Sequence, residues 1–206
     1  WEEEGIGYFF EHEKDKDTVV LGDGKHAFPE LSAYAQVELR DQPHLYEEGL
    51  FEFRAERSLQ PGATVLRDFR FKQPGLDMEA NAKGERFTEQ ALYFFPGEYV
   101  DPDVGQALVK VRLEEQQSQR ARYVGSGNVR AMLPGHTFTL SGHRRDDCNQ
   151  QYLLISVEHS GYQPQALGEE GGSTGEPAYQ NFVECIPADV PFRPLRITPM
   201  PSIPGV

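Results

Sequence analysis

The sequence is short of cysteine, of basic residues and of long apolar runs, and each shortage excludes a class of protein. Only Cys148 and Cys185 occur, too few for a disulfide-dense secreted scaffold or a four-cysteine zinc site. The 20 basic residues stand against 33 acidic ones, a net charge of −13. This charge argues against nucleic-acid binding, because phosphate contacts need clustered Lys and Arg. The longest apolar run, 91–95, has five residues, so we expect no stable membrane insertion.

The two ends of the sequence also lack familiar features. The chain opens with Trp1 rather than Met, and no basic segment followed by an apolar one is present, so we expect no signal peptide. Six of the last twenty residues are proline. Proline at that density is typical of an extended connector, because it cannot continue a helix or pair within a sheet. A connector that leads nowhere indicates a piece cut from a longer protein.

Apolar residues alternate at period two in several short stretches, which predicts strands. The predicted strands are a hairpin over 5–22, a strand at Phe51 and Phe53, a strand from Val65 to Phe71 that ends at Pro74-Gly75, a strand at Phe138 and Leu140, and a strand over 151–159 with Leu153, Ile155 and Val157 on one face.

One helix is predicted, from about 102 to 120. Asp101 can cap it, and Pro102 suits its first position. Three apolar residues then repeat at helical spacing and form an apolar stripe: Val104, Leu108 and Val111. We expect the polar second half, 112–120, to be a solvated face. Several short strands with a single helix predict the fold class: mainly β with one main helix, an α+β chain built on a β-barrel or a β-sandwich.

The patterns that could support catalysis or metal binding lack the context that this chemistry requires. Ser173 stands in a G-x-S-x-G match, but the stretch 168–177 holds only glycine, glutamate and other non-apolar residues. It predicts a mobile loop instead of the strand-to-helix turn that a nucleophilic serine needs. Two carboxylate pairs are better explained by a helix start and a polar turn: Asp101 with Asp103, and Asp146 with Asp147.

Four residues are the only grouping that could ligate zinc: His136, His143, Cys148 and His159. Their spacing matches neither a C-x-x-C pair nor two histidines one turn apart on a helix. We therefore predict no catalytic residue, no cofactor and no metal, and the composition indicates a β-rich, acidic, non-enzymatic module. A serine or metal hydrolase built on these patterns is the distant alternative.

Seven segments, read in order, resemble one family. They are 3–12 (EEGIGYFFEH), 66–74 (LRDFRFKQP), 93–99 (YFFPGEY), 111–115 (VRLEE), 133–140 (LPGHTFTL), 152–159 (YLLISVEH) and 186–194 (IPADVPFRP). Together they resemble VgrG, the spike protein of the bacterial type VI secretion system, in its phage baseplate-hub-like region (the late control D superfamily).

The resemblance implies a phage tail tube or hub-like barrel and a division of the chain. Residues 1–59 would be a partial intervening hub region, 60–190 the second tube-like β-barrel, and 191–206 a proline-rich connector toward a missing OB-fold. Residues 101, 102, 104, 108 and 111 would then be structural, because the family's hub region has no catalytic residues to carry over.

The resemblance also implies a role and partners. The protein would be a structural component of the type VI secretion puncturing device, the hub of a spike that caps the tube and delivers effectors. The full-length protein would be a homotrimer that meets a hexameric tube protein, the baseplate and effector proteins. It would be assembled in the bacterial cytoplasm and then injected into a target cell. The alternative is the baseplate hub protein of a contractile phage tail.

Overall fold

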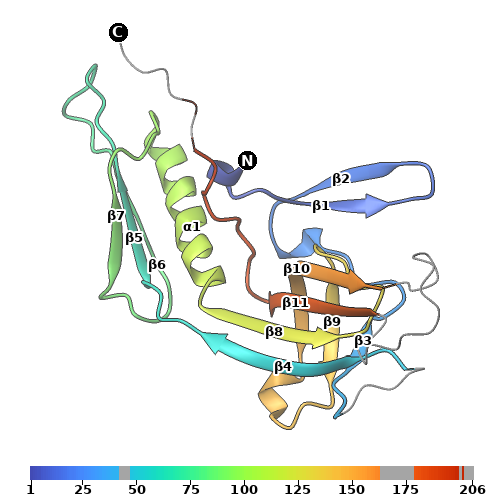
Figure 1. Cartoon of the computed structure of the whole chain (residues 1–206). Helices are drawn as coiled ribbons and strands as arrows, with labels where there is room; N and C mark the ends of the chain where they lie inside the picture. The colour runs from blue at the N-terminus through green and yellow to red at the C-terminus, as the bar shows by residue number, and fades with distance from the viewer. Residues whose placement is uncertain (42–46, 163–178, 200, 202–206) are drawn as a thin grey trace.

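The computed structural model describes residues 1–41, 47–162, 179–199 and 201, which form three sheets and one long helix (Figure 1). The strands are β1 (Gly7–His12), β2 (Asp17–Gly22), β3 (Gln36–Glu38), β4 (Leu50–Arg57), β5 (Ala63–Arg67), β6 (Glu79–Lys83), β7 (Ala91–Phe94), β8 (Ala121–Gly127), β9 (Thr137–Ser141), β10 (Gln151–Gly161) and β11 (Tyr179–Pro187). The helix is α1 (Pro102–Ser118), and short 3-10 turns are η1 (Glu2–Glu4), η2 (Lys25–Ala27) and η3 (Asp146–Cys148). The predicted loop at 168–177 lies outside the described residues.

The largest sheet has six strands in the order β3-β9-β10-β11-β8-β4 and curls around the main core (Figure 1). A bridge between Leu39 and Leu50 brings the two edge strands together at one end, and the Arg40 N–H donates to the Leu50 carbonyl over 2.8 Å. The interior is filled largely by aromatic and aliphatic side chains, among them Phe53, Tyr123, Met132, Phe138 and Tyr152. The mainly β fold class, with a curled barrel-like sheet and one helix, is therefore confirmed.

This sheet takes strands from both sides of residue 59. Strand β4 pairs antiparallel with β8, from Leu50–Gly127 to Arg57–Ala121, and β3 pairs parallel with β9. Residues 58–120 are thus an insertion between two neighbouring strands of one sheet. The structure differs here from the expected division at 59, because the barrel-like sheet combines β3 and β4 with β8, β9, β10 and β11.

The insertion forms a second lobe, in which α1 packs against the three-stranded sheet β6-β5-β7. Its small core contains Leu66, Met78, Ala80, Tyr99 and Val109. The ring of Tyr99, 5% exposed, lies against Gly105 of α1, where an added Cβ would come within 2.4 Å of the ring. The helix can pack directly over the Tyr99 ring because position 105 has no side chain.

The first two strands form the predicted hairpin, which is confirmed. One of its faces packs on the barrel-like sheet through Phe9, whose ring lies 6.0 Å from that of Phe28 and 5.3 Å from that of His136. Gly135 follows Pro134 with φ +79°, and a Cβ there would come within 2.3 Å of Phe9. The absence of a side chain at Gly135 therefore leaves the space in which Phe9 of the hairpin packs.

Other predicted strands are present with altered limits. The strands at Phe53 and at 137–141 are confirmed, but β5 ends at Arg67 because the Asp68 carboxylate accepts the backbone N–H groups of Phe69 and Glu98. In β10 a bulge between Leu154 and Ser156 shifts the register. The expected Leu153-Ile155-Val157 face is interrupted there, and both Leu153 and Leu154 are buried.

The helix begins as predicted and ends two residues early. The Asp101 carboxylate accepts the N–H of Asp103 over 2.9 Å, and Pro102 occupies the first position. The expected apolar stripe is shifted, because Val104 is 49% exposed whereas Val109, absent from that stripe, is fully buried. Leu108 packs against the lobe's core from a partly buried position. None of the helices in the described part of the chain has the length and apolar character to span a membrane.

Candidate functional site

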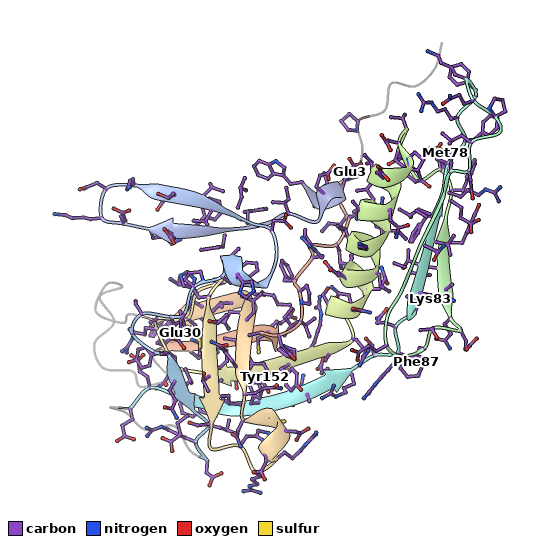
Figure 2. All side chains as sticks on the ribbon, turned by 180° about the vertical axis from the view of Figure 1, so that it is seen from behind. Glu3, Glu30, Met78, Lys83, Phe87 and Tyr152 are labelled. Atoms are coloured by element: carbon purple, nitrogen blue, oxygen red, sulfur yellow. The ribbon has the colours of Figure 1, made fainter. Side chains whose placement is uncertain are left out.

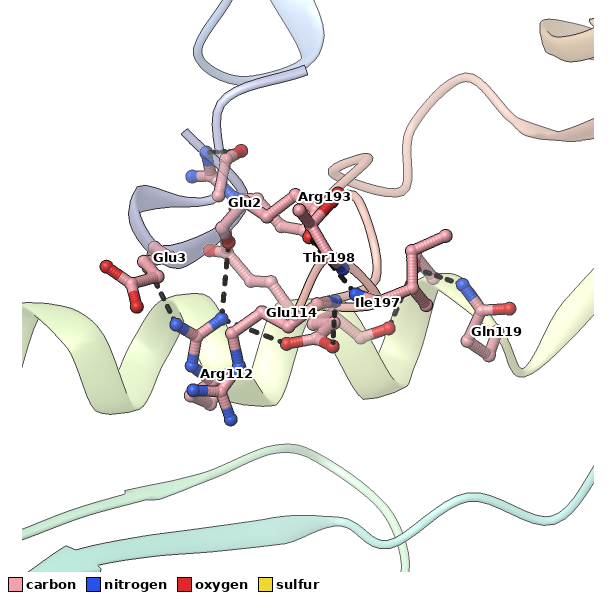
Figure 3. Close-up of polar contacts among 12 residues, drawn as sticks. Glu2, Glu3, Arg112, Glu114, Gln119, Arg193, Ile197 and Thr198 are labelled. Carbon is pink, nitrogen blue, oxygen red and sulfur yellow. Dashed lines mark hydrogen bonds and ion pairs between the residues drawn. The ribbon is translucent and has the colours of Figure 1, made fainter. Parts of the chain in front are cut away.

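The most elaborate polar cluster joins α1 to both ends of the described chain (Figure 3). We call it the polar junction and define it by Glu2, Arg112, Glu115, Arg193 and Thr198. Figure 2 places Glu3, from the N-terminal turn, beside α1, on the helix side opposite the three-stranded sheet. The junction therefore lies on the helix face that the second lobe leaves free.

Arg112 is its buried centre. Its guanidinium forms an ion pair with Glu115 at 3.1 Å, and the two side chains are only 5% and 8% exposed. It also donates to the backbone carbonyls of Glu2 and Glu3, over 3.4 and 2.8 Å. Burial lowers the pKa of Arg112, and the repulsion from Arg196 acts in the same direction. Because the charge is paired and its donors are used, the helix can hold it away from water.

The C-terminal segment joins the junction through Arg193. Its Nε donates to the Glu114 carboxylate over 2.7 Å, and its Nη1 donates to Asp23 over 2.6 Å and to the Gly5 carbonyl over 3.1 Å. One side chain thus connects four parts of the chain: the C-terminal segment, α1, the residues after η1 and those after β2.

Glu2 completes the junction. Its carboxylate accepts the backbone N–H groups of Ile197 and Thr198, over 3.1 and 3.0 Å, and the Thr198 hydroxyl over 2.8 Å. The hydrogen bonds from Thr198 lower the pKa of Glu2. The C-terminal segment is therefore bound to the first turn of the chain as well as to the helix.

The junction contradicts the expectation that the second half of α1 is a solvated face. Arg112, Glu115 and Ser118 are all buried, and Arg112 and Glu115 bond to segments more than 75 residues away in the sequence. The paired charges at 112 and 115 are one helical turn apart, but such pairs are also common on exposed helices. The sequence held no local signal that would have separated the two cases.

The structure gives the other candidate residues ordinary structural surroundings. His143 Nε2 lies 3.3 Å from the Phe53 carbonyl oxygen, and His159 contacts the Tyr179 hydroxyl at 2.5 Å. Cys148 is buried, and its carbonyl accepts the Tyr152 hydroxyl. Among the residues that the structure describes, no group of three or more His, Cys, Asp or Glu side chains is arranged to hold a metal ion.

The carboxylate pairs are likewise placed by local structure. Asp101 caps α1. Asp147 pairs with Arg145, whose Nη2 and Nε lie 2.6 and 3.0 Å from the two carboxylate oxygens. The hydrogen bonds from Arg145 lower the pKa of Asp147, so the carboxylate is held in its charged form. Ser173 lies outside the described residues.

An open cleft of about 870 Å³ adjoins the polar junction. Its walls include Trp1, Tyr8 and Phe94, together with Phe192 and prolines of the C-terminal segment. The Arg196 guanidinium lies 5.6 Å from the centre of the Phe94 ring, and the backbone N–H of Arg196 donates to the Glu115 carboxylate over 3.3 Å. The segment that borders the cleft is thus also held by the junction.

Comparisons with known proteins find relatives that align with nearly the whole chain. The chain is 34% identical over 209 residues to the type VI secretion system spike protein VgrG1a of Pseudomonas aeruginosa, covering 99% of this chain and 32% of that protein. It is 28% identical to the spike protein VgrG3 of Vibrio cholerae, covering 93% of this chain and 19% of that protein. The chain thus spans a third or less of the length of these curated relatives.

Solved structures share the fold at low sequence identity. An E. coli component of the type VI secretion system, described as similar to T4 bacteriophage tail proteins, superposes with a TM-score of 0.59 at 14% identity. It covers 99% of this chain and 40% of that one. The 43 kDa tail protein of prophage MuSo2 from Shewanella oneidensis has a TM-score of 0.56 at 8% identity, covering 84% and 48%.

The family model described as phage tail baseplate hub (GPD) matches residues 1–165, which include β1 to β10 and α1. The matched region therefore holds both lobes and most of the barrel-like sheet. This chain belongs to the phage tail baseplate hub (GPD) family.

Proposed function

We propose that this chain is the hub part of a type VI secretion spike, a structural component that caps the secretion tube and carries effectors. The observation that carries the proposal is the 34% identity to a type VI spike protein across 99% of this chain. The protein would act as an assembly of three copies. As a part that supports others, it would have no catalytic activity and need no cofactor.

The barrel-like sheet is the element proposed to meet the tube. A three-fold spike can match a six-fold tube if each copy contributes two similar barrels. We assign the sheet formed by β3, β4 and β8 to β11 as one of these barrels. The inserted lobe, 58–120, and the hairpin would lie around it and contact the baseplate or neighbouring copies.

The polar junction would serve to transmit force. The C-terminal segment, 191–206, is proposed as the connector toward an OB-fold and the needle of the spike. Arg193 and Thr198 bind its described part to α1 and to the first turn. A push on the connector would therefore reach α1 and the second lobe through several hydrogen bonds and ion pairs at once.

The proposal also sets a location. The protein would be assembled in the bacterial cytoplasm and then expelled with the tube, its partners being the hexameric tube protein, the baseplate and effector proteins. The second candidate, a baseplate hub of a contractile phage tail, is favoured by the description of the matching family and by the MuSo2 tail protein.

One experiment separates these candidates. The full-length protein, detected with an antibody, should appear in the medium of wild-type cells and disappear from it when the sheath gene of the secretion system is deleted. Recovery of the protein in purified phage tails, unaffected by that deletion, would support the phage hub instead. A protein that stays in the cells under both conditions would contradict both candidates.

A further inference from the structure

In the described part of the chain, one face of the β1–β2 hairpin is largely apolar and exposed, apart from the Trp1 ring, which lies 6.5 Å from that of Tyr8. Three rings follow one another along it, with centroids 6.0 Å apart between Tyr8 and Phe10 and 6.3 Å apart between Phe10 and His12. Opposite them in the pairing stand Leu21, Val19 and Asp17. We call these six residues the hairpin face. Tyr8 is 60% exposed, and Phe10, Val19 and Leu21 are each more than 40% exposed.

The exposure of this apolar face is not explained by the packing of the hairpin itself. The opposite side of the hairpin packs on the barrel-like sheet through Phe9, so the hairpin is held in place without help from its outer face. Contiguous apolar surface on a soluble protein marks a contact site more often than chance. The far end of the hairpin, 11–17, carries four acidic residues and two lysines, so an acidic rim borders the face.

A second exposed apolar site lies in the turn that follows β5. Phe69, Phe71 and Leu76 are 60%, 74% and 38% exposed, and the Lys72 ammonium lies 5.8 Å from the centre of the Phe71 ring. The tip of this turn, 69–76, contains Arg70 and Lys72 and no acidic residue, and Asp68 and Asp77 flank it, in a chain whose net charge is −13. We call this stretch the cationic turn.

The two sites are complementary, but they cannot meet within one chain. In both views of the molecule α1 stands between them, with the hairpin on one side and the connection from β5 to β6 on the other (Figures 1 and 2). A contact between them must therefore join two copies. Because it uses two different surfaces, it is a head-to-tail contact, which can close into a ring.

We propose that the hairpin face of one copy receives the cationic turn of the next copy, with Phe69 and Phe71 on the aromatic row and Lys72 beside the Asp17 carboxylate, one oxygen of which also lies 2.7 Å from His12 Nδ1. This inference rests on the proposed function, which requires three copies, and it names the surfaces that join them. A contact of this kind buries aromatic side chains at its centre and leaves charged pairs at its rim, the usual arrangement in protein interfaces.

Cross-linking of the full-length protein tests this contact. The native Cys148 and Cys185 are 1% and 0% exposed and should not react with a short bismaleimide in the folded protein. A variant with Val19→Cys and Phe71→Cys should give covalent dimers and trimers. Its yield should exceed by about tenfold that of a control with Val19→Cys and Leu59→Cys, because the reacting groups are held together at a contact. Leu59 is a matched aliphatic residue, 63% exposed.

The possible outcomes distinguish the inferred contact from the proposed function. Trimers in sedimentation without cross-linking above the control would overturn the inferred contact and leave the proposed function standing. A full-length protein that sediments as a monomer would overturn both. Cross-linking of the Val19→Cys variant alone would show a symmetric contact between two hairpins and overturn the head-to-tail arrangement.

Charge reversal gives an independent readout in the same cysteine background. Asp17→Lys and Lys72→Asp should each lower the cross-linking yield about two- to fivefold, the range expected for one exposed ion pair. The variant with both changes should recover the yield, since the pair is restored with its charges exchanged. If the cross-linking yield of the double variant falls by the product of the two single losses, the two residues do not pair.

Discussion

Gly105→Ala is a sharp test of how α1 packs on its sheet. Alanine in place of glycine inside a helix normally stabilises it by about 1 kcal/mol. Here the new methyl group would lie 2.4 Å from the Tyr99 ring, which is buried and whose hydroxyl donates to the Leu66 and Met78 carbonyls. Overpacking costs about 1–3 kcal/mol, and the disturbed hydroxyl bonds add about 1–3 kcal/mol. With the helix gain of about 1 kcal/mol subtracted, we therefore expect a net loss of about 1–5 kcal/mol.

The measurement is urea unfolding followed by far-UV circular dichroism. Gly75→Ala is the control, because a Cβ at Gly75 has nothing within 4 Å, and it should change stability by less than about 0.5 kcal/mol. The decisive variant combines Gly105→Ala with Tyr99→Ala. Without the ring, the alanine at 105 should stabilise the protein by about 1 kcal/mol. If Gly105→Ala stabilises the wild type, or destabilises both backgrounds equally, the ring contact is not the cause.

Three further predictions concern the helix and the polar junction. Val109→Asp should destabilise the fold by about 3 kcal/mol or more, whereas Val104→Asp, at a half-exposed position, should change it by less than about 1 kcal/mol; similar losses at both sites in urea unfolding would contradict the observed helix face. Arg112→Met should cost about 3–5 kcal/mol because it leaves the Glu115 carboxylate buried without its partner. Adding Glu115→Leu should recover much of this loss, and a further loss in the double variant would show that the charged pair is itself stabilising. The pKa of Glu2 is lowered by its bonds to the C-terminal segment, so that contact is fully stabilising above pH 4.5 and is lost as the pH falls through the lowered value. The fluorescence of the single tryptophan, next to it, should therefore show an acid transition below pH 4.5 that Glu2→Gln abolishes, and a transition that persists in that variant would assign it to another group.

The parts of the fold that could be predicted from the sequence depend on near neighbours. Asp101 and Pro102 define the start of α1 through bonds within one turn, and the hairpin over 5–22 follows from alternation and a charged turn. The family resemblance added the fold class and the hub region, since its seven segments are spread along the chain.

The remaining parts could not be predicted because they depend on distant contacts. Arg112 is buried by residues 109 and 110 positions away, and nothing in 112–120 by itself indicates a cover. The short strand β3 has three residues and gains its place by pairing with β9, about 100 positions later. The bulge after Leu154 changes which side chains are buried without leaving a mark on the alternation.

The insertion of the second lobe between β4 and β8 has a consequence for how the chain is made. The edge strands of the six-stranded sheet come from residues 36–57, but the strands that pair with them begin at residue 121. During synthesis, more than sixty residues must therefore follow β4 before β8 and β9, the sheet partners of β4 and β3, have been made. The inserted lobe, whose contacts are local, can fold in that interval, whereas the large sheet depends on long-range closure and should form last and slowly. Until β8 and β9 are complete, β4 and β3 lack the sheet partners that cover their buried side chains, and this is the stage at which the chain is most prone to aggregate.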